Sequence, residues 1–329
     1  MYYNNQINKE ENKKLYKIAD IIKEKDNFLI TAHVNSDGDS ISSILLLNDI
    51  VKQFGKRAVI CIDDKVPEKF DFLPGTGDIV TFDELKPFTP DVTVVLDASN
   101  LHRTGRVQSI ISRSETVLSI DHHGSNDGFG TINFVDSNAS STVEIVYRLI
   151  NILGINITKE MALYVYNGIV CDTGSFSFPN TTEASLAICA DMVHFGVEPG
   201  FVAKNLYQRS SPDTLRALAA SLSTLEFYFN GKVGCMYLAN GFVSKGNNVD
   251  TEGFVDYLLS VEGTEVEFFM IEENPGYFRV SLRSKEYVDV NKVAGALGGG
   301  GHPRAAGCRI SGNVDDVKEE ILNILKSYV

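Results

Sequence analysis

The chain has 329 residues, 43% of them hydrophobic, which is enough for two domains with separate cores. Its formal net charge of −13 opposes the binding of a long polyanion, because such binding relies on a broad Lys and Arg surface. Its five cysteines form no CxxC pair, so they offer no zinc or disulfide framework and suit a reducing compartment.

The N-terminal segment is polar and lacks the apolar core of a signal peptide. No apolar run reaches the roughly eighteen residues that a membrane span needs. We therefore expect a soluble, cytoplasmic protein that has no membrane partner.

The first half of the chain alternates strand-like and helix-like segments. The expected strands are residues 28–34, 57–63, 92–97, 117–121 and 131–135. The expected helices are residues 40–54, 139–153, 158–171 and 182–195. This alternation predicts an α/β domain with a mainly parallel sheet.

The second half is richer in strands. Residues 197–211 contain EPG and RSSP and are expected to form a linker. The elements expected after it are a helix over 212–228, strands over 231–239, 266–273 and 277–284, and a closing amphipathic helix over 314–329. The sequence thus predicts two domains, 1–196 and a smaller α/β domain over 212–329, with the active site in the cleft between them.

Side chains of metal-binding type follow the first expected strand. His33, Asp37 and Asp39 lie in HVNSDGDS, where a glycine turn lets one imidazole and two carboxylates converge. One imidazole among several carboxylates suits Mn²⁺ or a similar divalent ion better than a zinc site built on thiolates. Taken alone, this HxxxDxD pattern is more simply explained by helix capping.

Further candidates extend this set. Asp97 follows the apolar run VTVVL, Asp121, His122 and His123 follow VLSI, and Asp172 follows YNGIVC. The carboxyl ends of the strands of an open α/β sheet form its ligand crevice, so these groups should meet in one place. Burying so much negative charge is costly unless cations neutralise it. The combined set therefore predicts bound metal ions on electrostatic grounds.

The ordered motifs resemble a known family. HVNSDGDS, VVLDAS followed by RTG, SIDHHGS and VCDTGSFSF resemble the four motifs of the DHH superfamily of phosphoesterases. SLRSK and GGGGHPRAAG resemble the glycine-rich signature of the DHH-associated C-terminal domain. The resemblance runs from Phe28 to Ile310 and extends to the bacterial oligoribonuclease (nanoRNase) and pAp phosphatase group, where pAp is 3′-phosphoadenosine 5′-phosphate. Ser36 departs from the pattern, since the family often has Pro there, and only loop stiffness should change.

The resemblance implies a role for each motif residue. One divalent ion would be held by His33, Asp37 and Asp97. The other would be held by Asp39, Asp97, His122 and Asp172, so that Asp97 bridges the pair. Asp121 would orient a histidine and His123 would contact the phosphate, which gives catalytic roles to Asp97, Asp121 and His123.

The glycine-rich segment of the second domain is expected to bind substrate. Its backbone amides would form an anion-binding nest, and Arg suits bidentate phosphate contacts. The resemblance implies contacts from Arg283, Ser284, Gly300, Gly301 and His302, to which the residues themselves add Arg304 as a local donor. Arg279 would share a strand face with Arg283 and is a weaker candidate.

The expected reaction is the hydrolysis of phosphate esters in very short nucleotides, by a hydroxide that bridges two divalent ions and without a covalent enzyme intermediate. The preferred function is degradation of short oligoribonucleotides to mononucleotides together with removal of the 3′-phosphate of pAp. The alternative is a cyclic di-AMP or linear di-adenylate phosphodiesterase, which the sequence does not separate from the first. A RecJ-type single-strand exonuclease, a family II pyrophosphatase and a non-catalytic nucleotide sensor are less favoured.

The expected cofactors are two divalent cations per chain, Mn²⁺ with Mg²⁺ or Co²⁺ as alternatives. The expected partner is a short RNA, a dinucleotide or pAp, and no long double-stranded nucleic acid. The resemblance also implies a homodimer.

Overall fold

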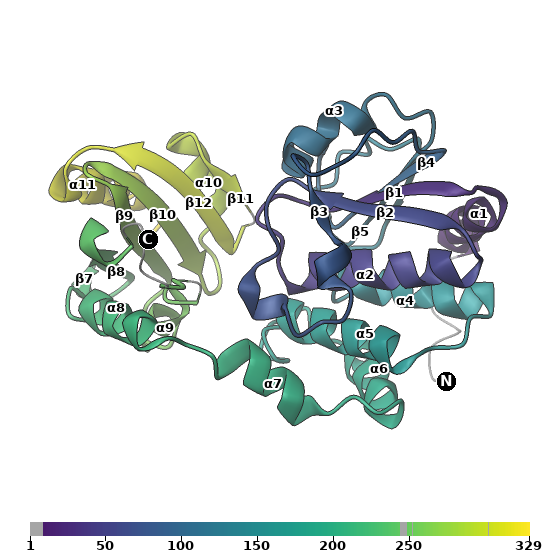
Figure 1. The fold of residues 1–329 in the computed structure, drawn as a ribbon. Coiled ribbons are helices and arrows are strands. Elements are labelled where there is room, and N and C mark those ends of the chain that lie inside the picture. The colour runs from purple at the N-terminus through teal and green to yellow at the C-terminus, as the bar shows by residue number, and fades with distance from the viewer. Residues whose placement is uncertain (1–8, 244–248, 252, 302) are drawn as a thin grey trace. The chain divides into compact units, whose positions relative to one another are not determined.

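The computed structural model describes residues 9–243, 249–251, 253–301 and 303–329. The expected substrate contact His302 lies outside these residues. The chain divides into two compact units, Met1–Arg209 and Ser210–Val329, which are called here the N-terminal and the C-terminal unit (Figure 1). Each has a six-stranded sheet with helices, so the expected α/β class is confirmed.

The sheet of the N-terminal unit is parallel throughout, with the strand order β3-β2-β1-β4-β5-β6. Its strands are β1 (Asn27–Thr31), β2 (Arg57–Ile62), β3 (Val80–Thr81), β4 (Val92–Leu96), β5 (Val117–Asp121) and β6 (Ile132–Val135). The strand order reverses between β1 and β4, because the chain first builds outward from β1 on one side and then returns to its other side. The carboxyl ends of β1 and β4 therefore define the position where a doubly wound sheet binds its ligand.

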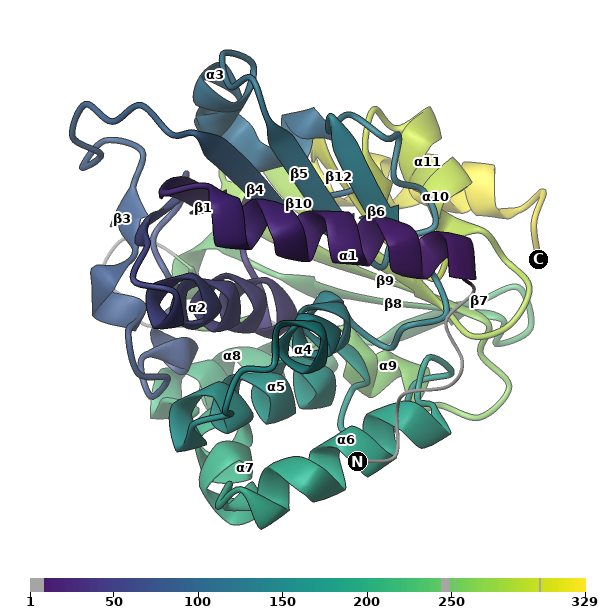
Figure 2. The same ribbon diagram turned by 90° about the vertical axis from the view of Figure 1, so that its right-hand side faces the viewer.

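Helices cover both faces of this sheet. The helices of this unit are α1 (Lys9–Glu24), α2 (Gly38–Gln53), α3 (Gln108–Ile111), α4 (Thr142–Leu153), α5 (Lys159–Asp172), α6 (Glu183–His194) and α7 (Pro199–Tyr207). Helices α1, α2 and α4 pack on one face, while α3 and the 3₁₀ segment Leu101–Val107 pack on the other (Figure 2). Because α5 packs on the outer side of α2, helix α2 is buried nearly all round, which explains its apolar sequence.

Two segments of the N-terminal unit differ from the expectation. Residues 197–211, expected as a linker, contain α7, which Pro199 favours at its first turn and whose Val202 is fully buried in the core of this unit. Helix α1 was not expected because its segment is strongly polar. Its apolar residues Leu15, Ile18 and Ile22 nevertheless follow helical spacing and are fully buried.

The C-terminal unit has a mixed sheet with the order β11-β12-β10-β9-β8-β7, in which only β8 and β9 pair in parallel. Its strands are β7 (Glu226–Tyr228), β8 (Val233–Leu238), β9 (Val266–Asn274), β10 (Tyr277–Ser284), β11 (Gly300–Gly301) and β12 (Ala305–Ser311). Its helices are α8 (Pro212–Leu222), α9 (Asp256–Leu259), α10 (Val290–Ala296) and α11 (Val314–Leu325). The helix expected over 212–228 therefore ends early, and its last residues form β7.

Helices α10 and α11 pack on one face of this second sheet, and α8 and α9 pack on the other. Among the described residues, no single helix is long and apolar enough to cross a membrane. Helices α6 and α7 bend by 111° at their junction, and they meet the criteria of length and composition only when they are taken as a pair.

A buried ion network fixes the start of α4. Arg148 donates to Asp136 at 2.5 Å and to Glu144 at 2.6 Å, and the other oxygen of Glu144 accepts from the backbone N–H of Ser140 at 2.9 Å. Glu144 and Arg148 are 1% and 7% exposed. This network joins α4 to the segment after β6 and so sets where the N-terminus of α4 lies.

We predict that Arg148→Met destabilises the protein by about 3–5 kcal/mol, because it leaves two carboxylates in the interior without their cation. Urea-induced unfolding measures this loss. The control is Arg113→Met, which removes an exposed arginine of the same unit and should change the unfolding free energy by less than about 0.5 kcal/mol. Equal small losses in both variants would show that the network contributes nothing to stability.

Candidate active site

The loop after β1 and the first turn of α2 bring His33, Asp37 and Asp39 to the carboxyl end of the sheet. Asp37 caps α2 and accepts from the backbone N–H groups of Asp39 and Ser40, each at 3.0 Å. His33 Nδ1 lies 2.8 Å from the carbonyl of Val34 and 3.4 Å from Arg103 Nη2, and the shorter contact, to a group that only accepts, assigns the proton to this nitrogen. His33 Nε2 then points at the carboxylates, 3.7 Å from Asp37 Oδ2.

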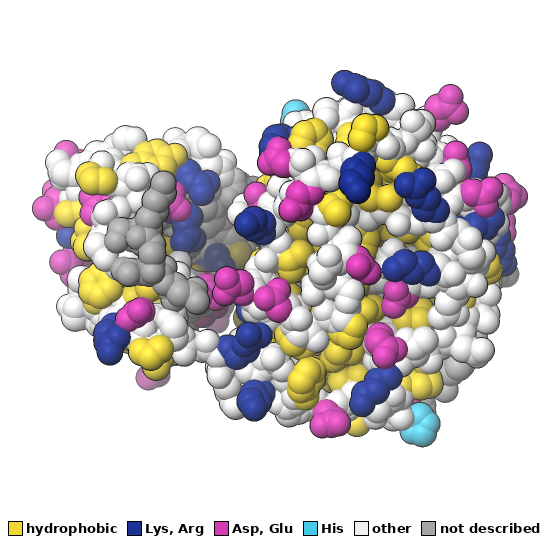
Figure 3. Space-filling view, in the orientation of Figure 1, with side chains coloured by type: hydrophobic (Ala, Val, Ile, Leu, Met, Phe, Trp, Pro, Cys, Tyr) yellow, Lys and Arg dark blue, Asp and Glu magenta, His cyan; other side chains and the backbone are white. Residues whose placement is uncertain are grey.

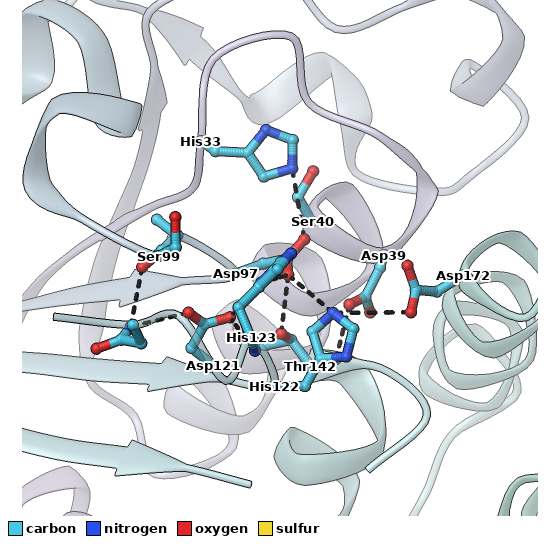
Figure 4. A network of polar contacts seen from close by, with 12 residues as sticks. His33, Asp39, Ser40, Asp97, Ser99, Asp121, His122, His123, Thr142 and Asp172 are labelled. Carbon is cyan, nitrogen blue, oxygen red and sulfur yellow. Dashed lines mark hydrogen bonds and ion pairs between the residues drawn. The ribbon is translucent and has the colours of Figure 1, made fainter. Parts of the chain in front are cut away.

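Asp97 lies at the centre of the site (Figure 4). It follows the last residue of β4 and is 2% exposed. Its φ of 57° is a left-handed backbone conformation that residues other than glycine rarely adopt. Its Oδ2 is 3.4 Å from His33 Nε2, and its Oδ1 is 3.7 Å from His122 Nε2. Strained backbone of this kind is concentrated at functional sites.

The two histidines after β5 have different partners. His123 Nδ1 lies 2.7 Å from Asp121 Oδ1, and Asn126 donates to the other oxygen of Asp121 at 2.8 Å. His122 Nε2 instead lies 3.7 Å from Asp172 Oδ2, the same distance as from Asp97. Asp121 therefore orients His123, while His122 faces two of the expected metal ligands.

Asp172 reaches the site through close packing of α5 on α2. Gly38, the first residue of α2, has no room for a Cβ, because that atom would overlap the side chain of Cys171. Asp172 follows Cys171 at the end of α5, and Asn180 donates to its Oδ2 at 3.1 Å. The absence of a side chain at Gly38 therefore allows α5 to pack closely on α2, and this packing brings the motif of Asp37 and Asp39 next to that of Asp172.

Asp39 is held by the N-terminus of α4. Its Oδ2 accepts from the backbone N–H of Thr142 at 2.6 Å, and its Oδ1 accepts from that of Val143 at 2.9 Å. The side chain of Thr142 donates to Asp97 Oδ1 at 3.0 Å. The positive end of the α4 dipole therefore faces a carboxylate that is only 1% exposed.

Two groups of potential ligand atoms have Asp97 in common. One consists of His33, Asp37 and Asp97, and the other of Asp97, His122 and His123; within each group the atoms lie within 4.8 Å of one another. Asp39 and Asp172 belong to neither group but act electrostatically on Asp97 or on each other. The structure thus brings all six expected metal ligands into one region.

The site carries more negative charge than its protein neighbours neutralise. Burial, with Asp97 and Asp172 nearby, raises the pKa of Asp39 well above its usual value. Burial, with Asp37 and Asp97 nearby, raises the pKa of Asp172 to about 7. In the part of the chain that the structure describes, no Lys or Arg forms an ion pair with Asp37, Asp39, Asp97 or Asp172.

The neighbouring carboxylates raise the pKa values of His33 and His123. Burial opposes the charge on His33, but hydrogen bonds to Asp37 and Asp97 outweigh it and raise its pKa well above the usual value. The pKa of His123 rises to about 9 because its bond to Asp121 and the charge of Asp97 outweigh burial. Carboxylate oxygens and imidazole nitrogens are ligands of divalent ions, and such ions would supply the missing positive charge. The residues present therefore fit a divalent metal site.

Three residues that support the site were not singled out from the sequence. Thr142 contacts both Asp39 and Asp97, and the amides of Asn126 and Asn180 hold carboxylates of two other motifs. The stretch SNASS, which directly precedes Thr142, indicates only the start of a helix. Nothing in that pattern indicates that the helix points at Asp39.

In the C-terminal unit the glycines have different environments. A Cβ on Gly301, whose φ is 152°, would lie 2.5 Å from the carbonyl of Ala305, and a Cβ on Gly299 would overlap that of Gly307. A Cβ on Gly300 would meet only the side chain of Asn291, at 3.7 Å. Close pairing of β11 with β12 thus requires glycine at 299 and 301 but not at Gly300.

The other expected substrate contacts are partly engaged within the unit. Arg283 Nε lies 3.5 Å from Asp256 Oδ1. Ser284 is 6% exposed, and both its hydroxyl and Arg304 donate to the carbonyl of Val288 at 2.7 Å. Arg283 and Arg304 both reach solvent, with 33% of the Arg283 side chain exposed, whereas Ser284 is buried.

The N-terminal unit is a doubly wound parallel sheet with carboxylates and imidazoles where the strand order reverses, and a smaller unit with a mixed sheet follows it. These features define the protein as an α/β protein with a candidate metal centre. Residues 27–169 match the DHH family, N-terminal domain, and residues 234–329 match the DHHA1 domain. The chain is 33% identical over 316 residues to the bifunctional oligoribonuclease and PAP phosphatase NrnA of Thermus thermophilus, covering 95% of this chain and 94% of the relative. The chain therefore belongs to the DHH family of phosphoesterases, which are divalent-metal-dependent hydrolases.

Other relatives extend the comparison over the same length. A Bacillus subtilis protein with the same name is 27% identical over 297 residues, covering 87% of this chain and 90% of the relative. The crystal structure of an exopolyphosphatase-related protein from Bacteroides fragilis has a TM-score of 0.92 and 27% identity, and covers 99% of this chain and 98% of its own.

We predict that Thr142→Val lowers the affinity for Mn²⁺ about tenfold or more, since groups that orient metal ligands have effects of this size. The substitution keeps the shape of the side chain but removes the donor to Asp97. Titration calorimetry measures the affinity, and far-ultraviolet circular dichroism checks the fold. Thr142→Ser keeps the hydroxyl and should restore binding. Unchanged affinity in Thr142→Val would show that Thr142 only packs.

Proposed function

We propose that this chain degrades short oligoribonucleotides to mononucleotides and removes the 3′-phosphate of pAp. The observation that carries the proposal is the position of Asp97, a buried carboxylate shared by two groups of potential ligands. The likeness to relatives named for both activities, over almost the whole chain, supports this choice of substrates.

Two divalent ions would be held by the motif residues. His33, Asp37 and Asp97 would hold one ion; Asp39, Asp97, His122 and Asp172 would hold the other. When bound, such a pair supplies Lewis-acid stabilisation of the charge that develops on the phosphoryl oxygens. We propose Mn²⁺ as the ion, because imidazole nitrogens and carboxylate oxygens are mixed in both sets.

The residues around this centre would orient the reacting groups. Asp121 fixes the ring of His123 through Nδ1, and we propose that His123 contacts the scissile phosphate. Thr142 and the N-terminus of α4 hold Asp39 and Asp97 in place, so that these carboxylates need not reorganise when a substrate binds.

The C-terminal unit, which we propose to be the substrate-binding domain of residues 212–329, would hold the rest of the nucleotide. Arg283 would pair with a phosphate, and the backbone of Gly300 and Gly301 would approach it closely, since no side chain intervenes. His302 stays a predicted contact. A substrate of this size needs only a few local cations, which fits a chain of net charge −13.

A hydrolysis panel with Mn²⁺ tests the function. It contains pAp, a ladder of di- to pentaribonucleotides, linear and cyclic di-adenylate, pyrophosphate and a long single-stranded DNA. We expect mononucleotides from the short RNAs and phosphate from pAp.

Asp97→Asn should lower both rates at least a thousandfold, because one substitution disrupts both metal sets, whereas Asp63→Asn removes a carboxylate of a neighbouring loop and should keep most of the activity.

Each other outcome of the panel has a defined meaning. Preference for cyclic or linear di-adenylate would favour the alternative phosphodiesterase function, and digestion of the long DNA would contradict the argument from charge. Full activity of Asp97→Asn with two ions still bound would refute the metal assignment. A homodimer in the cytoplasm stays a prediction, which sedimentation and cell fractionation can check.

We predict that Gly300→Ala raises KM for pAp about tenfold without loss of stability. The structure has room for the new methyl group, but that group would lie where we place the phosphate. Steady-state kinetics and thermal melting measure the two effects. Gly295→Ala is the matched control, because a Cβ there meets nothing within 4 Å and should leave KM unchanged. Loss of folding in Gly300→Ala, or an unchanged KM, would contradict the proposed contact.

A further inference from the structure

One face of the C-terminal sheet carries an ordered set of arginines. Along β10, Phe278, Val280 and Leu282 point into the core that α10 and α11 cover. The alternate residues Arg279, Ser281 and Arg283 therefore point to the opposite face. Ala306 and Cys308 of β12 lie in that same core, so Ala305, Gly307 and Arg309 share the face of the arginines.

Arg279 and Arg309 lie directly opposite each other on the paired strands β10 and β12. Like charges in that position destabilise a sheet. Glu273 contacts both, at 3.1 Å from Arg279 Nε and 3.5 Å from Arg309 Nε. One carboxylate does not neutralise two guanidinium groups, so a positive charge remains uncompensated within this trio, and the arginine side chains stay 37% and 57% exposed.

Small residues separate these arginines from Arg283. Ser281 pairs with Gly307, and Gly307 pairs with Gly300 of β11, so one row across three neighbouring strands carries almost no side-chain bulk (Figure 1). Lys and Arg side chains gather over this part of the unit (Figure 3). Arg283 and Arg279 are four residues apart on one strand, which is about 13 Å.

We propose that Arg279 and Arg309 form a second phosphate position, which binds the backbone of an oligonucleotide beyond the nucleotide held at Arg283. This inference rests on the proposed function and names its preferred substrate class, linear oligoribonucleotides of three or more nucleotides. Paired guanidinium groups suit a phosphodiester, because each offers parallel N–H donors. The row of Ser281, Gly307 and Gly300 carries no bulky side chain between the two proposed phosphate positions, and Arg279 and Arg283 contact Thr251 and Asp256 at its two ends.

Substrates of different length distinguish the role of this position from that of the rest of the site. pAp and a 5′-phosphorylated dinucleotide each carry two phosphates, whereas a 5′-phosphorylated trinucleotide carries three. Only substrates with a third phosphate would therefore use Arg279 and Arg309. Glu273 would compete with that phosphate for both arginines.

The experiment compares KM for pAp and for 5′-phosphorylated di-, tri- and pentaribonucleotides in Arg279→Gln, Arg309→Gln and the double variant, all in the full chain with Mn²⁺. We expect KM for the tri- and pentanucleotides to rise about threefold or more in each single variant, with pAp and the dinucleotide unchanged. The double variant should also lower the slope of log KM against log salt concentration by about 0.7 for each lost contact.

Two further variants define the outcome. Glu273→Gln removes the competing carboxylate and should lower KM for the longer substrates alone. Arg216→Gln, which removes an arginine of α8 that is 72% exposed, should change no KM. Equal changes for pAp and for the trinucleotide, or no change for either, would overturn the inference. Wild-type protein that hydrolyses none of these substrates would instead refute the proposed function.

Discussion

The electrostatic cost of placing four carboxylates at one end of a sheet governs the architecture of the N-terminal unit. Asp37 and Asp39 at the start of α2, Asp97 after β4 and Asp172 at the end of α5 come from three separate segments and meet where the strand order reverses. Two helix N-termini reduce the cost, since the first turn of α2 donates to Asp37 and that of α4 donates to Asp39. The remaining charge is what makes the site receptive to cations.

This constraint explains why residues far from the reaction carry buried charge of their own. The N-terminus of α4 serves Asp39 only if α4 is held in place, and the pair of Arg148 with Glu144 and Asp136 holds it. Burying the three charged groups costs desolvation free energy, and three hydrophobic side chains of similar volume would stabilise the core equally well. Its value lies in fixing where the backbone N–H groups of Thr142 and Val143 point. Stability and site geometry are coupled here through one helix.

The sequence was sufficient for five of the six parallel strands, because each is an apolar run, but not for the two-residue strand β3. It also predicted that the candidate ligands would meet, because Asp97 and Asp172 directly follow apolar runs. Asp97 and Asp121 could be placed from their strands alone. The contact of Asp39 with Thr142 could not, because 103 residues separate them and only the packing of α4 brings them together. Helix α7 within residues 197–211 was not predicted for a related reason, since turn residues such as Pro199 also begin helices. Ser284 stays a predicted substrate contact, and its hydroxyl bonds the backbone carbonyl of Val288, which residue type does not reveal.

Charge is distributed so that a strongly acidic chain still offers positions for anions. In the N-terminal unit the carboxylates outnumber their protein counter-ions, and cations must make up the difference. In the C-terminal unit the imbalance is reversed on a small scale, because Arg279 and Arg309 share the single carboxylate of Glu273. Net charge governs the long-range field, which repels a polynucleotide, whereas these local imbalances act only within about 8 Å at physiological salt. The proposed selection for short substrates would then follow from how many such positions exist and not from the size of any cavity.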